Sequence, residues 1–338
     1  IAPTFDTTNN KVVIAFINGS STDQGQAVVG DIDSSGVISF GSAVTYNAEI
    51  EEQQGIAFDS NANKVVIAYD SKPTSKGQVI SGTVSGTSIT FDSETVFEAA
   101  DVEGVSVVFD SNANKSVIAY EDVGNSQYGT GIVFAPASTT LTSENYIGMS
   151  RGVAFQSGEA GSTGTAVSFE SGLTELSHAA FDSSNNKVVI AYVDGDDTNK
   201  GKAVVATVSG TSISFGSLVT YEAGNTSNID CVFDSSNNKI VIVYSDAGDS
   251  GRSKGIVGTV SGTSISFGSP TQFNSGANYA YDVAAAFDNS NNKVVVAYRD
   301  SGNSSYGTAA VGTVSGTSIS FGTPVVYESA NSQQNAVV

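Results

Sequence analysis

The chain has 338 residues, and its 34 acidic against 14 basic side chains give a formal net charge of −20. This acidity excludes nucleic-acid binding through a basic surface, and the absence of a long apolar run excludes membrane insertion. The single cysteine and single histidine exclude an internal disulfide and a Cys/His metal cluster. Only 14% of residues are charged, and Gly, Ser, Thr and Asn supply the polar positions, which favours an all-β protein.

One phrase recurs six times and organises the whole chain. Each copy has the form Phe-Asp, a short Ser/Asn-rich stretch, and then an apolar run such as Lys-Val-Val-Ile-Ala-Tyr. The copies begin at spacings of 53, 51, 72, 52 and 54 residues, at Phe5, Phe58, Phe109, Phe181, Phe233 and Phe287. A period of about 50 residues is typical of repeat architectures such as propellers and solenoids.

Each repeat predicts four β-strands, as its second copy illustrates. Residues 55–58 form a first strand, and an Asp/Asn-rich turn leads to a second, continuously apolar strand at 64–69. Residues 78–84 and 87–91 flank Ser-Gly and predict a hairpin whose last strand alternates. We interpret the aspartate of each Phe-Asp pair as the residue that caps the first turn.

Four antiparallel strands per repeat predict a single β-propeller domain over 1–338, with six blades and seven as the alternative. We expect the ring to be closed by its terminal strands, with 335–338 beside 1–4, because the next Phe-Asp in phase would fall at position 339. The predicted units are about 1–52, 53–104, 105–150, 177–228, 229–282 and 283–338. The long 72-residue interval predicts an insertion or a degenerate blade at 150–176.

Several stretches resemble the repeat arrays of tail-fibre-like and other virion surface proteins of marine bacteriophages. They are 181–192, 299–308 and 317–328, and 141–148 resembles a phrase that follows such arrays. The resemblance implies a protein on the virion surface or outside the cell that attaches or displays. It brings no catalytic motif, and 150–176 departs from its pattern.

Loops after the second strands combine an aromatic ring with a carboxylate, a pairing that suits sugar binding. The predicted ligand-binding residues are Tyr120, Asp122, Tyr192, Asp194, Tyr244, Asp246, Tyr298 and Asp300, although an ordinary acidic turn explains them as well. The acidic loop at 194–201 lacks the pattern of a Ca²⁺ site, in which aspartates at alternate positions are followed by a distal glutamate, and it contains Lys200, so we expect no metal and no other cofactor.

Acidic residues also precede the first strands, near the expected mouth of the central channel. The predicted acidic rim consists of Glu52, Glu103, Glu175, Asp230 and Asp282, and uncompensated surface acidity is the alternative. His178 lies three residues before Phe181 in a predicted inner strand, and we interpret it as a structural side chain.

The sequence therefore predicts a non-catalytic binding module that acts through its blade loops. Its expected partners are a cell-surface glycan, a protein receptor or other virion proteins. The alternatives are a spacer or decoration subunit of a fibre or capsid, and an enzyme acting on polysaccharide. We expect no enzyme, because the repeats are near-equivalent and the Asp-box phrase of sialidase-type propellers needs a tryptophan that this chain lacks.

Overall fold

An aspartate closes the first hairpin of every repeat. In the fourth repeat, the Asp182 carboxylate accepts hydrogen bonds from the backbone N–H groups of Ser184 (2.9 Å) and Asn185 (3.1 Å). The last turn residue, Asn186, has a φ of 53°, a left-handed conformation that asparagine tolerates. The same two bonds form at Asp6, Asp59, Asp110, Asp234 and Asp288. The predicted capping role is confirmed.

The computed structural model describes residues 1–19, 22–137, 160–274, 276, 278–332 and 335–338, without the side chains of 51–53 and 176. Within these residues the strands form six antiparallel sheets, each with three full strands and an outer fourth strand broken into two short segments. The first sheet contains β1 (Ala2–Asp6), β2 (Lys11–Asn18), β3 (Gln24–Ile32), β4 (Ile38–Phe40) and β5 (Val44–Asn47). The second contains β6 (Ile50–Asp59), β7 (Lys64–Ser71), β8 (Lys76–Ser85), β9 (Ser88–Phe91) and β10 (Thr95–Val96).

Two long strands link the third, fourth and fifth sheets. The third sheet contains β11 (Val102–Asp110), β12 (Lys115–Asp122), β13 (Tyr128–Ala135), β14 (Ser162–Thr163) and the start of β15 (Val167–Asp182). The fourth contains the end of β15, β16 (Lys187–Asp194), β17 (Lys200–Ser209), β18 (Ser212–Phe215) and the start of β19 (Val219–Asp234). The fifth contains the end of β19, β20 (Lys239–Asp246), β21 (Arg252–Ser261), β22 (Ser264–Phe267) and β23 (Thr271–Gln272).

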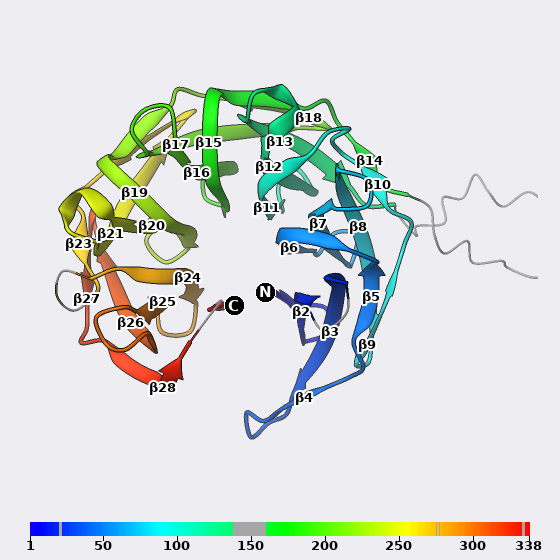
Figure 1. Ribbon diagram of the computed structural model, residues 1–338, viewed down its shortest axis with the longest axis horizontal. Helices are drawn as coiled ribbons and strands as arrows, with labels where there is room; N and C mark the ends of the chain where they lie inside the picture. The colour runs from blue at the N-terminus through cyan, green and yellow to red at the C-terminus, as the bar shows by residue number, and fades with distance from the viewer. Residues whose placement is uncertain (20–21, 138–159, 275, 277, 333–334) are drawn as a thin grey trace, which may run out of the picture.

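The sixth sheet completes the array, and the loops of the described ranges contain two single-turn 3₁₀-helices. The sheet contains β24 (Ala280–Asp288), β25 (Lys293–Asp300), β26 (Tyr306–Ser315), β27 (Ser318–Phe321) and β28 (Val325–Asn331). The 3₁₀-helices are η1 (Val123–Asn125) and η3 (Ala247–Asp249). The sheets radiate around a common axis, with both chain termini near the centre (Figure 1). No helix among the described residues is long and apolar enough to cross a membrane.

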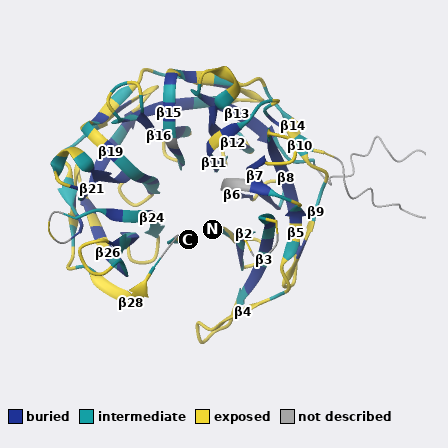
Figure 2. Cartoon of the chain, in the orientation of Figure 1, coloured by how far each residue is buried: buried dark blue, intermediate teal, exposed yellow. Residues whose placement is uncertain are grey.

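The core lies between successive sheets. The second strands of the second to fifth sheets are buried on both of their faces: in β20 every residue from Ile240 to Asp246 is buried. This confirms the expectation from its continuous β-branched run, because alternation is lost when both faces of a strand are covered. Exposed residues gather on the outer loops and on β28 (Figure 2).

Part of the expected insertion at 150–176 belongs to the third and fourth sheets. Residues 150–159 lie outside the described residues. The pairs Phe134↔Thr163 and Thr130↔Ser168 make 162–163 and the start of β15 the outer edge of the third sheet. From Thr174 onward, β15 is the inner strand of the fourth sheet.

The expected closure by the terminal strands is not present in the part of the chain that the structure describes. Residues 335–337 line the same cavity as Ile1 and Pro3, but 335–338 belong to no strand, and β1 pairs with β2 alone among the described residues. The reason lies in the repeat register. Val338 follows Tyr327 by 11 residues, as Val232 follows Tyr221, so 335–338 correspond to the positions that 1–4 already fill in the first sheet.

Replacing the turn aspartate is expected to destabilise the protein. Asp182→Ala leaves the N–H groups of Ser184 and Asn185 without their partner, at a cost of about 1–3 kcal/mol in the free energy of unfolding. Asp182→Asn retains one acceptor oxygen and should recover part of that loss. Urea denaturation of the three proteins measures the difference, and an unchanged midpoint for Asp182→Ala would refute the capping role.

Candidate functional site

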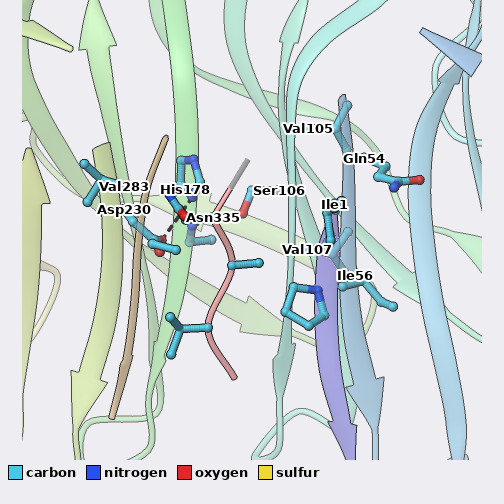
Figure 3. A pocket seen from close by; sticks show the side chains of 17 residues that line it. Ile1, Gln54, Ile56, Val105, Ser106, Val107, His178, Asp230, Val283 and Asn335 are labelled. Carbon is cyan, nitrogen blue, oxygen red and sulfur yellow. Dashed lines mark hydrogen bonds and ion pairs between the residues drawn. The ribbon is translucent and has the colours of Figure 1, made fainter. Parts of the chain in front are cut away.

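One position of the repeat lines the centre of the ring. It lies three residues before the recurring phenylalanine, on the innermost strand of each sheet. Its six occupants are Ala2, Gly55, Ser106, His178, Asp230 and Ala284. All six line one central cavity of about 260 Å³ (Figure 3). Residues that build the blades repeat from unit to unit, whereas this position changes almost every time.

His178 and Asp230 make the polar centre of the cavity. His178 lies on β15 and Asp230 on β19, and the imidazole Nδ1 is 3.1 Å from Asp230 Oδ1 (Figure 3). Asp230 is itself fixed by the backbone N–H groups of Cys231 (2.7 Å) and Ala285 (2.8 Å). A carboxylate held in this way orients the ring, and among the described contacts Nε2 makes no hydrogen bond. Nε2 is therefore available to a bound molecule.

Ser106 occupies the equivalent position on β11, the inner strand of the preceding sheet, but its hydroxyl already takes part in a hydrogen bond. Ser106 Oγ accepts a hydrogen bond from the backbone N–H of Ala179 at 3.1 Å. The side chains of Ser106 and Asp230 thus each bind the backbone of the next sheet. No hydrogen bond joins Ser106 to His178 among the described contacts, although a nucleophile and its base need one.

The cavity also has apolar walls and a polar edge. Ile56, Val107 and Val283 line it beside the Gln54 amide. Asn335 closes it on the side of the sixth sheet, where its Nδ2 donates to the backbone carbonyl of Asp282 (3.4 Å). Apolar walls with a few fixed polar groups are typical of small-molecule sites.

The predicted loop residues do not form an exposed binding surface. The rings of Tyr120, Tyr192, Tyr244 and Tyr298 are fully buried between sheets. The Tyr192 and Tyr244 hydroxyls donate to Glu170 and Glu222 of the preceding sheet, at 3.0 Å each. Such burial does not fit the predicted use of these rings as sugar platforms. The geometry indicates a packing role.

The paired aspartates are also directed inward. Asp122, Asp194, Asp246 and Asp300 are buried, and backbone N–H groups of the turns that follow bind their carboxylates. In the loop at 194–201, the ammonium group of Lys202 lies 3.3 Å from Asp197 and forms an ion pair with Asp194. The Lys202 ammonium group thus occupies the position between these carboxylates that a metal cation would need. No group of three metal-ligating side chains gathers in the described part of the chain.

The predicted acidic rim is divided among separate sites. The Glu52 side chain lies outside the described residues, Asp230 belongs to the central cavity, and Asp282 pairs with Arg299 at 3.0 Å. Glu103 and Glu175 both act on Glu121, a buried residue that sequence reasoning missed. Burial, followed by the charge of Glu103, raises the pKa of Glu121 to about 7, against the lowering effect of its hydrogen bond from Gln127.

The radial array of four-stranded antiparallel sheets defines the protein as a β-propeller. Solved structures share this fold at low sequence identity. A protein from Lactobacillus plantarum aligns with a TM-score of 0.59 and 12% identity, over 93% of this chain and 82% of its own. A putative 6-phosphogluconolactonase from Bacteroides uniformis aligns with a TM-score of 0.59 and 12% identity, over 98% and 86%.

A third solved structure, AofleA from Arthrobotrys oligospora, aligns with a TM-score of 0.51 and 10% identity, over 96% of this chain and 87% of its own. No protein-family model matches the sequence, and a search of curated proteins finds no significant match. The similarity to solved structures therefore concerns the fold.

Proposed function

We propose that this propeller is a non-catalytic binding module that takes a glycan in its central cavity. The observation that carries the proposal is the variation at the channel-lining position. Five of the six repeats differ from the next one there, and His178 and Asp230 form a fixed polar pair in the cavity. Positions that only build blades have no physical reason to vary in this way.

The chemistry of the cavity supports a sugar as the ligand. Aliphatic side chains such as Ile56 and Val283 suit the apolar face of a sugar ring, and His178, Asp230 and Gln54 supply donors and acceptors for hydroxyl groups. We further propose that the module acts on a virion surface or outside the cell, attached to a host glycan. That part rests on the resemblance of 181–192, 299–308 and 317–328 to virion surface repeats.

Binding is favoured over catalysis by the state of Ser106. The row Ser106, His178 and Asp230 contains the residue types of a hydrolytic triad, and one structural neighbour is described as a putative lactonase. However, the Ser106 hydroxyl is bound to Ala179, and Asp230 is shared with two backbone N–H groups. Hydrolysis of glycans or lactones by the wild-type protein, lost in Ser106→Ala, would establish the enzyme instead.

A glycan array tests the proposal directly. We expect wild-type protein to bind a subset of glycans and His178→Ala to bind them at least about tenfold more weakly, because the hydrogen bond between the imidazole and the ligand is lost. Lys187→Gln is the matched control: it lies on β16 at the first turn, away from the cavity. Absence of any bound glycan or target cell at high protein concentration would refute the proposed function.

A further inference from the structure

Successive sheets are joined by apolar clusters, but the ring has one uncovered junction. Five clusters of buried apolar residues join the first sheet to the second and so on up to the sixth. No such cluster joins the sixth sheet to the first among the described residues. In Figure 1, β28 and β4 stand apart on either side of this junction.

The sixth sheet leaves exposed the face that every other sheet buries. Val311 on β26 is 46% exposed. The valines at the same repeat position, Val29, Val133, Val205 and Val257, are at most 1% exposed, because the following sheet covers them. Val325 and Tyr327 of β28 are exposed beside Val311, and Val325 pairs with Ala309, which lies on the same face as Val311. This surface is apolar because the sixth repeat has apolar residues at the positions that the following sheet buries in the other repeats.

The first sheet leaves its opposite face exposed, the face that the preceding sheet covers in the other blades. Ile38 on β4 is 40% exposed, whereas its equivalents Ile89, Ile213, Ile265 and Ile319 are 3–5% exposed under the preceding sheet. Phe40 is exposed beside it. At this junction the sixth sheet lacks the following blade that covers the equivalent face of the other sheets. The first sheet lacks the preceding blade that covers the opposite face.

Two contacts that recur between blades lack their partner at the sixth sheet. A Cβ on Gly268 would lie 1.8 Å from the carbonyl oxygen of Thr317 in the next hairpin, and Gly41, Gly164 and Gly216 show the same close approach. Gly322, their equivalent, has no such neighbour. Glu222 binds Tyr244 of the next sheet, whereas Glu328 makes only the local bond to Ala330 among the described contacts.

The first blade lacks the groups that would complete these contacts. Phe16 stands where the other five blades carry the buried tyrosine, so it has no hydroxyl to donate to Glu328. The hairpin of the first blade, Asp33–Val37, is also longer than the Ser-Gly-Thr hairpin that fits against the glycine. Direct closure of the sixth sheet on the first would therefore leave both contacts unmade.

The last described residues already lie as the inner strand of a further unit would. Asn335 Nδ2 donates to the carbonyl of Asp282 on the sixth sheet. At the equivalent positions of the fourth and third sheets, Ser177 Oγ donates to the carbonyl of Gly104. The same inter-blade bond thus joins 335–338 to the sixth sheet.

We propose that the junction between the sixth and first sheets is the seat of a seventh blade of this same repeat. The occupant is a four-stranded antiparallel unit with a Ser-Gly-Thr hairpin against Gly322, a tyrosine against Glu328, and aliphatic faces against Val311 and Ile38. A second copy of the whole chain does not match this description, because its exposed first blade carries Phe16 and the longer hairpin.

The test joins a copy of residues 233–274 directly after Val338, in the repeat register given by Tyr221 and Tyr327. The added unit supplies a tyrosine and a Ser-Gly-Thr hairpin in the required positions. We expect the melting temperature to rise by several degrees and the added unit to resist proteolysis. An extended chain with one extra residue before the copy reverses the faces of its first strand and should show neither effect.

Gly322→Ala provides the decisive readout. We expect it to leave the melting temperature of the 338-residue chain unchanged within about 1 °C and to remove most of the gain in the extended chain. Equal effects in both backgrounds would overturn the proposal. So would an intramolecular disulfide between Cys introduced by Val311→Cys and Ile38→Cys in the monomeric 338-residue chain, or a dimer that buries these two faces.

Discussion

Replacing Gly268 with alanine is expected to destabilise the protein by about 3 kcal/mol, near the upper end for overpacking a tight site. The added Cβ would lie 1.8 Å from the Thr317 carbonyl oxygen and 2.9 Å from its carbonyl carbon. These are backbone atoms of the neighbouring blade, so relief requires the two sheets to move apart. Chemical denaturation of wild type and variant measures the loss.

Gly322→Ala is the matched control for this effect. Gly322 follows its outer strand as Gly268 does, and both donate a backbone hydrogen bond to the third strand, at 2.9 and 3.0 Å. Neither has a positive φ, so alanine is compatible with both backbones. We expect a change below about 0.5 kcal/mol at Gly322. Equal losses at the two positions would contradict the assigned contact between blades.

Glu121→Gln is expected to stabilise the protein at neutral and higher pH by about 2–3 kcal/mol. Burial and the neighbouring Glu103 raise the pKa of Glu121 in the folded state to about 7, above the ordinary value of 4.5. Ionised Glu121 therefore disfavours folding, and the wild type loses this stability as the pH rises from 4.5 to 7. Glutamine removes the charge and keeps an acceptor for the Gln127 side chain.

The pH dependence identifies the cause. Below pH 4.5 both proteins carry a neutral side chain at position 121, so their unfolding free energies should converge. Glu103→Gln should produce a smaller gain with the same pH dependence, because Glu103 is exposed and acts only through its charge. Stabilisation by Glu121→Gln that is equal at pH 4 and pH 8 would refute the assignment.

The strands and their turns could be predicted because every repeat carries the same local sequence pattern. A β-branched run after an Asp/Asn turn specifies a hairpin locally, and six copies remove the ambiguity of any one. The burial of Tyr192 and Tyr244 could not be predicted in this way. Their partners, Glu170 and Glu222, lie on the preceding sheet, and a motif within one repeat does not show which of its side chains the next blade covers.

The central pair could have been found from the same repeats. His178 and Asp230 are 52 residues apart, but each lies three residues before its phenylalanine, so both occupy equivalent places on adjacent inner strands. Comparing the repeats position by position gives this signal, whereas searching for local motifs does not. The sixth repeat gives no such signal for the uncovered junction, because it carries the same interface residues as repeats that are covered. In the first repeat, Phe16 and the longer hairpin are the differences that comparing the repeats shows.

The most direct test of the central-cavity assignment is a calorimetric titration of the protein with a glycan identified on the array. Binding in the cavity predicts one ligand per chain, with at least about tenfold lower affinity in His178→Ala and unchanged affinity in Lys187→Gln. Several equivalent ligands per chain, or the same affinity in His178→Ala, would contradict the assignment. Either result would indicate that the ligand binds to the repeated surfaces of the blades instead.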